Sequence, residues 1–191
     1  MTRTGFTLIE LIIVIAIIAI LATTVILVLN PAVILAEARD SQRIADLGQM
    51  NSALGLFLAT VKVEAGDLGS AANCYIHVTD GAAVGTKCGN RHNGTNRVGV
   101  TRDVDGTGWI PVKISDVSGG SPLSSWPVDP TSNSTLFYSY ATAGGTQLSF
   151  ELNADMESER YGNGGKDDIE NGDGGNRPNI YEVGNAAGLS L

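Results

Sequence analysis

Two cysteines and two histidines are the residues of this 191-residue sequence that offer the most chemical options. Cys74 and Cys88 enclose about fifteen residues, and oxidation of such a pair contributes about 3 kcal/mol by reducing loop entropy. The spacing of Cys74, His77, Cys88 and His92 is also one that zinc could accept. The residues alone leave three alternatives open: a disulfide, a zinc site or two free thiols.

The C-terminal part of the sequence is acidic and rich in glycine. Residues 151–191 hold nine acidic and three basic residues, which account for most of the net charge of −8. Carboxylates such as Asp167, Asp168 and Asp173 are the hard oxygen ligands that calcium prefers. Because residues 151–191 contain no complete calcium-binding loop motif, a solvated acidic loop is the alternative. Calcium is therefore a possible cofactor, and no other cofactor is predicted.

Charge and motif content disfavour two functional classes. A net acidic surface repels phosphate, so we do not expect nucleic-acid binding. The sequence contains no nucleophile elbow, phosphate-binding glycine loop or zinc-protease motif, so we expect no catalytic site. One stretch is locally basic and is expected to be a solvated loop; its charged residues are Lys87, Arg91, Arg97 and Arg102.

The cellular compartment of these residues depends on the role of an apolar segment near the N-terminus. No residue from Leu11 to Ala36 is charged. Residues 11–29 in a helix would span about 28 Å, close to the thickness of a bilayer's hydrocarbon core. A cleaved signal peptide, a plain membrane anchor and a buried helix are the alternatives. The uncharged length disfavours a buried helix, and the run is long for a signal peptide.

The residues before the apolar run distinguish between these alternatives. Gly5-Phe6-Thr7-Leu8-Ile9-Glu10 resembles the processing motif of type IV prepilins and of type II secretion pseudopilins, with a tight match over residues 1–22. The resemblance implies a membrane peptidase that cuts after Gly5 and methylates Phe6. Only the leader, residues 1–5, would be lost. It also implies that Glu10 meets the Phe6 amine of an adjacent copy during filament assembly, which would compensate a carboxylate placed beside hydrocarbon.

One long helix, from about Phe6 to Val63, is predicted to follow the cut. Pro31 should kink it, because proline removes a backbone hydrogen bond. Residues 6–30 form the transmembrane and assembly half, and residues 31–65 form an amphipathic half. Apolar residues recur there at helical spacing, with the opposite face polar; the apolar positions are Ile44, Leu47, Met50, Leu54, Phe57, Leu58 and Val61, and the polar ones are Asp40, Arg43, Asp46 and Gln49.

Residues 66–191 are predicted to form a globular head of short strands in glycine-rich loops. Alternating apolar residues on either side of Gly144-Gly145 indicate an antiparallel hairpin. The expected fold class is α+β, with the long helix packed on a small antiparallel sheet. The expected strands are Cys74–Thr79, Arg97–Thr101, Trp109–Ile114, Leu136–Ala141 and Thr146–Leu152. Just before the hairpin, Trp126–Pro130 resembles the Pro-Asp loop of pseudopilin-like heads.

The resemblance implies a structural role. The chain would be a single-pass membrane precursor with its head outside the cytoplasm, and would then join a homo-oligomeric pilus or periplasmic filament. Its partners would be the prepilin peptidase and methyltransferase and an assembly platform. A head outside the cytoplasm favours the Cys74–Cys88 disulfide over zinc or free thiols. A pseudopilin and a monomeric membrane-anchored binding module are the alternative functions.

Overall fold

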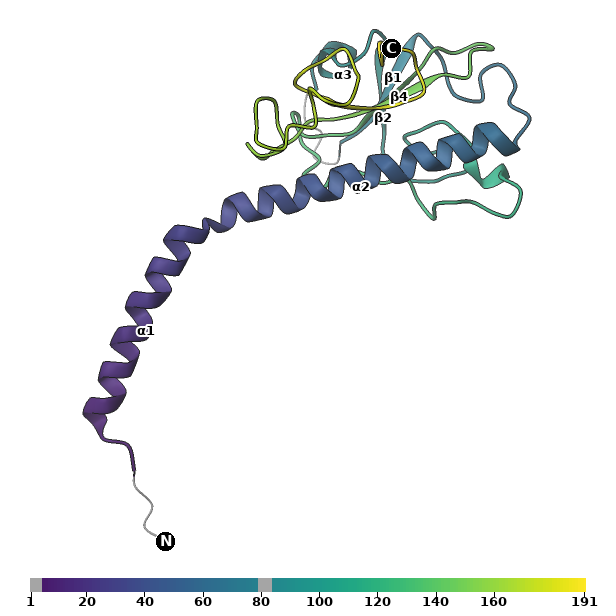
Figure 1. The fold of residues 1–191 in the computed structure, drawn as a ribbon. Coiled ribbons are helices and arrows are strands. Elements are labelled where there is room, and N and C mark those ends of the chain that lie inside the picture. Colours follow the sequence, from purple (N-terminus) through teal and green to yellow (C-terminus); the bar gives the residue numbers. More distant parts are fainter. Residues whose placement is uncertain (1–4, 79–83) are drawn as a thin grey trace. The chain divides into compact units, whose positions relative to one another are not determined.

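The computed structural model describes residues 5–78 and 84–191 (Figure 1). The chain divides into two units, Met1–Ala36 and Glu37–Leu191, which are described separately. The end of the expected strand Cys74–Thr79 lies outside the described residues.

The first unit is dominated by α1, Leu8–Leu29. Within it, Leu8–Ile26 has a mean hydropathy of 2.9 and is long enough to cross a membrane. The hydroxyl of Thr23 donates to the carbonyl oxygen of Ile20 at 2.8 Å, and that of Thr24 donates to Leu21 at 2.8 Å. These bonds satisfy the two threonine hydroxyls of α1 within the helix, as a hydrocarbon environment requires.

The helix is interrupted at Asn30, directly before the proline at which the sequence predicted a kink. Asn30 has a left-handed conformation, with φ 35° and ψ 84°. Pro31 then begins α2, Pro31–Thr60. A proline suits the first position of a helix because its missing N–H would have no partner there. The second helix ends three residues before the predicted Val63.

Five short strands form one sheet in the order β2-β1-β3-β4-β5. Their bounds are β1 Asn73–His77, β2 Thr95–Gly99, β3 Ser139–Thr142, β4 Phe150–Ala154 and β5 Tyr181–Gly184. The hairpin predicted around Gly144-Gly145 is confirmed, since β3 and β4 pair antiparallel with Tyr140 opposite Leu152. The expected antiparallel sheet is confirmed for three of the four strand pairs, and the fourth pair, β1 and β2, is parallel.

One predicted strand is wrong, and one strand was not predicted. Trp109–Ile114 is not a strand: it is irregular and runs into a short 3-10 helix, Ile114–Asp116. Its side chains Trp109, Ile110, Val112 and Ile114 are buried all the same, and Pro111 has no N–H to give to a sheet. The edge strand β5, which the sequence analysis did not propose, completes the sheet.

The core of the second unit lies between α2 and one face of the sheet (Figure 1). Leu47, Met50, Leu54 and Phe57 of α2 are fully or almost fully buried. They belong to one cluster with side chains of β3 and β4 that point to the same face, including Tyr140. The apolar stripe predicted for this helix therefore packs on the head.

The opposite face of the sheet is covered by a smaller cluster that contains the two cysteines. Beside it lies α3, Thr86–Asn90, a single turn with an unusual backbone. Lys87, Cys88 and Gly89 have φ of 56°, 51° and 70°, so the turn is left-handed. Such a conformation costs residues with a Cβ roughly 1–2 kcal/mol each, so other contacts must hold it.

Candidate processing and assembly site

The expected cleavage point lies in an open segment before α1. Phe6 is 84% exposed. A Cβ added at Gly5 would meet no atom within 4 Å. The fold around Gly5 therefore does not require a glycine, so any requirement for glycine there must come from a partner such as a peptidase.

Thr7 and Glu10 together cap the start of α1. The Glu10 carboxylate accepts from the Thr7 backbone N–H at 2.9 Å and from the Thr7 hydroxyl at 2.7 Å. The Glu10 N–H in turn donates to the Thr7 hydroxyl oxygen at 3.3 Å. This reciprocal capping box satisfies free donors of the helix and places a negative charge at its positive end. Glu10 is therefore held at the first turn, four residues after Phe6.

The predicted disulfide between Cys74 and Cys88 is confirmed, with Cα atoms 6.2 Å apart. It joins β1 to the left-handed turn α3. Both thiols that the zinc alternative would need are consumed in this bond. The remaining members of that set, His77 and His92, are buried.

The basic stretch is not uniformly solvated, because Arg91 is only 4% exposed. Its guanidinium lies 3.7 Å from the centre of the Phe137 ring and donates to the carbonyl oxygens of Thr135 and Phe137. Burial lowers the pKa of Arg91 to about 10. The expectation of a solvated loop is wrong for this residue, which fastens the α3 region to the segment before β3.

The three carboxylates proposed for calcium have separate partners. Asp167 pairs with Arg160 at 2.6 Å. Asp168 accepts from backbone N–H groups, including that of Gly164 at 2.8 Å, and Asp173 accepts from two others, of Gly175 and Glu182. Within residues 5–78 and 84–191, no group of three or more His, Cys, Asp or Glu side chains is placed to hold a metal ion. We therefore assign no calcium site.

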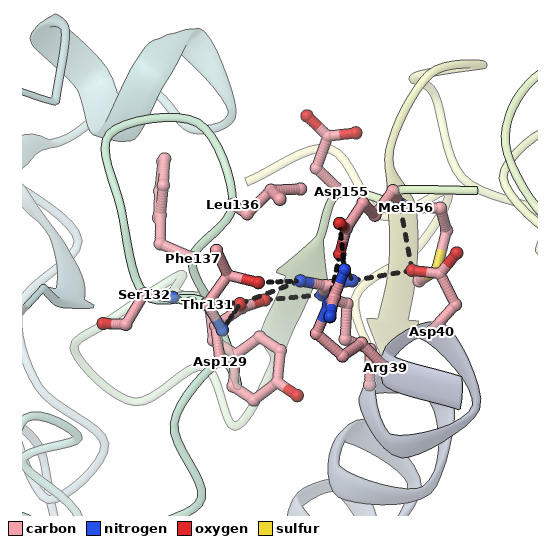
Figure 2. Close-up of polar contacts among 12 residues, drawn as sticks. Arg39, Asp40, Asp129, Thr131, Ser132, Leu136, Phe137, Asp155 and Met156 are labelled. Carbon is pink, nitrogen blue, oxygen red and sulfur yellow. Dashed lines mark hydrogen bonds and ion pairs between the residues drawn. The ribbon is translucent and has the colours of Figure 1, made fainter. Parts of the chain in front are cut away.

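A buried ion cluster centred on Arg43 was missed by the sequence analysis. Arg43 was expected on the polar, exposed face of the helix, yet its side chain and that of Asp40 are 0% exposed. The guanidinium binds Asp40 at 2.7 Å and Asp129 at 2.7 and 3.0 Å. Figure 2 shows Asp40 and Asp129 on opposite sides of the guanidinium that they bind. The sequence contained one signal of this cluster: Asp129, the acidic residue between the two prolines of the Trp126–Pro130 loop.

The carboxylates of this cluster also hold the chain around them. Asp40 accepts from the backbone N–H groups of Glu157 and Ser158 at 2.9 and 2.8 Å. Asp129 accepts from those of Thr131 and Ser132 at 2.8 and 3.1 Å. Arg43 thus joins α2 to the loop before β3 and to the segment after β4. Because the Arg43, Asp40 and Asp129 side chains are buried and bonded to neighbouring segments, we assign the cluster a structural role.

A second buried chain of contacts has the residue types of a hydrolase triad. His92 Nε2 lies 3.0 Å from the Ser139 hydroxyl, and His92 Nδ1 lies 3.6 Å from a Glu151 oxygen. All three residues are at most 1% exposed. Burial lowers the pKa of His92 to about 3, so the imidazole is neutral. Because Ser139 is buried, a substrate cannot reach its hydroxyl. The three residues are a hydrogen-bonded part of the protein interior.

Fold and site together define an α+β protein whose exposed apolar N-terminal helix begins with a capped Thr-x-x-Glu turn. Residues 1–26 match the prokaryotic N-terminal methylation motif, the motif of type IV pilin and pseudopilin precursors. The apolar helix and this motif fit a membrane-anchored precursor with its head outside the cytoplasm. Comparison with curated proteins and with solved structures gave no significant match.

Proposed function

We propose that this chain is a structural subunit of an extracytoplasmic type IV pilus-like filament. The methylation motif at residues 1–26, placed directly on an exposed apolar helix, is the observation that carries the proposal. None of the span Leu8–Ile26 is buried within the described chain. An apolar surface of this length needs lipid or other protein around it. A membrane supplies the first, and neighbouring copies in a filament supply the second.

Processing would create the group that Glu10 is proposed to bind. In the uncut chain the Phe6 nitrogen belongs to a peptide bond and carries no charge. Cleavage after Gly5 would convert it to an amine, which is positively charged even after a single methylation. An amine from an adjacent copy would then pair with the Glu10 carboxylate, which lies at the exposed start of α1.

The first experiment is to determine the N-terminal residue and the mass of the chain recovered from cells. A chain that begins at N-methylated Phe6 supports the proposal, and its presence in sheared surface filaments identifies a pilin. The same chain confined to the envelope identifies a pseudopilin or an anchored binding module. A chain that still begins at Met1, or one cut beyond Ala22, overturns the filament proposal.

Glu10→Gln is expected to reduce filament yield at least tenfold while insertion and cleavage continue. Glutamine keeps the capping box with Thr7 but removes the charge, and breaking a buried interfacial charge pair typically costs about 2–5 kcal/mol. Thr7→Ala is the matched control, since it removes the cap and keeps the charge. Filament mass per cell is the measurement. A loss of filaments in Thr7→Ala but none in Glu10→Gln would show that Glu10 acts only as a helix cap.

A further inference from the structure

Glu151 and Glu182 are two buried carboxyl groups on neighbouring strands of the head. The strand register places Glu182 of β5 opposite Asn153 of β4, two residues from Glu151, so all three side chains share one face of the sheet. Each of the three is at most 1% exposed. Glu151 and Glu182 are therefore diagonal neighbours on adjacent strands, a separation that long side chains can span. Two ionised carboxylates buried so close together repel each other, which favours retention of one proton by the pair.

The surrounding donors indicate which carboxyl holds this proton. Glu151 accepts from the Asn153 side-chain N–H at 2.9 Å and from the Leu191 backbone N–H at 2.8 Å, contacts that favour its ionised form. Glu182 Oε2 accepts from the Arg177 backbone N–H at 2.9 Å. Its other oxygen, Oε1, is buried and has no hydrogen-bond donor in the part of the chain that the structure describes. A proton on Oε1 that is donated to Glu151 satisfies both groups.

We propose that Glu151 and Glu182 share one proton and act as a pH-sensitive latch that holds β5 and the C-terminal segment on the sheet. Among the strands of residues 5–78 and 84–191, β5 lies at an edge of the sheet and pairs with β4 alone. Loss of the shared proton places two negative charges on neighbouring strands at this edge. The strand that carries one of them and the segment bonded to the other would then be released. This latch belongs to the head and does not depend on filament assembly.

The other charged groups around the pair leave its proton in place. Neutral His92 approaches from the segment that follows α3, with Nδ1 3.6 Å from Glu151. Asp173, from the loop before β5, accepts from the Glu182 N–H, and its negative charge opposes ionisation of Glu182. The Arg177 side chain is the nearby positive charge, and it acts mainly on Glu151. Burial, reinforced by the charge of Glu151, raises the pKa of Glu182 to about 7.

The sign of the pH dependence follows from this raised pKa. The folded head binds the proton more tightly than the unfolded chain, in which glutamate has a pKa of about 4.3. The stabilisation is therefore complete below about pH 4 and is lost progressively as the pH rises to about 7. Local opening of β5 should become easier by up to about tenfold per pH unit across that range.

Hydrogen exchange of the full-length chain in detergent micelles, from pH 5 to 9 and with a chelator present, tests the latch. Protection factors of the β5 amides, Tyr181–Gly184, are expected to fall by up to about tenfold per unit between pH 5 and about 7, while those of β3 stay constant. Glu182→Gln should make the β5 values independent of pH. Glu159→Gln removes an exposed carboxyl group from the same part of the chain and should keep the wild-type profile.

An infrared titration of the wild-type chain provides a test that does not require a folded variant. A protonated carboxyl signal that persists at pH 6 and disappears above about pH 7 is expected. Absence of that signal at pH 6 would overturn the proposal. A wild-type β5 protection profile that does not change with pH, or one that Glu182→Gln leaves unaltered, would do the same.

Discussion

Arg43→Met is expected to destabilise the head by about 3–5 kcal/mol, because it leaves two buried carboxylates without their positive partner. Asp40 and Asp129 each bind the Arg43 guanidinium at 2.7 Å, and the Arg43 side chain is 0% exposed. Both acids also hold backbone N–H groups of neighbouring segments, so neither can turn towards water without breaking those bonds. The measurement is the free energy of unfolding of the full-length chain in detergent micelles by chemical denaturation.

Arg39→Met is the matched control for this prediction. Arg39 lies one helical turn from Arg43 and also pairs with Glu157, but its side chain is 34% exposed. A solvent-exposed pair contributes about 1 kcal/mol or less, so the control should lose no more than that. Arg43→Lys keeps the charge without the forked geometry that binds Asp129 twice, and should fall between the two. Similar losses for Arg39→Met and Arg43→Met would refute the central role of Arg43.

Removal of the disulfide is expected to cost about 3 kcal/mol of stability. The bond closes a loop with a sequence separation of 14, and both cysteines are 0% exposed in an apolar cluster. Cys74→Ala/Cys88→Ala is preferred to a serine pair, because it places no hydroxyl in that cluster. The left-handed turn α3 should also lose order, since the bond is one of the contacts that hold it.

The same experiment contains its own control. The free energy of unfolding of the wild-type chain should fall on addition of a thiol reductant, whereas that of Cys74→Ala/Cys88→Ala should not respond. A double variant within about 1 kcal/mol of wild type would show that the closed loop does little for stability.

The features that were predicted correctly are those that local sequence patterns determine. The apolar run of α1, the amphipathic stripe of α2 and the alternation around Gly144-Gly145 each depend on residues close together in the chain. The disulfide needed only the presence of two cysteines in one extracytoplasmic region. The Thr7-x-x-Glu10 spacing carried the signal of a capping box as well as that of the methylation motif.

The features that were missed depend on residues far apart. The position of Arg43 on α2 indicates only a polar face, and its burial follows from an acid 86 residues later. The segment from Trp109 contributes apolar side chains to the core without entering the sheet, a distinction that side-chain type alone does not make. The edge strand β5 is short and lies in a glycine-rich region, so its partner β4 defines it more than its own composition does.

The capping box of α1 has a further consequence for how the precursor would be converted. Both of its members, Thr7 and Glu10, lie after the proposed cut, so removal of residues 1–5 would leave the helix start with all its own hydrogen bonds. From Phe6 onwards the immature and mature subunits would then share one backbone structure. Maturation would remove the leader with its Arg3 charge and create a positive charge at the Phe6 nitrogen, and no refolding step would separate cleavage from assembly.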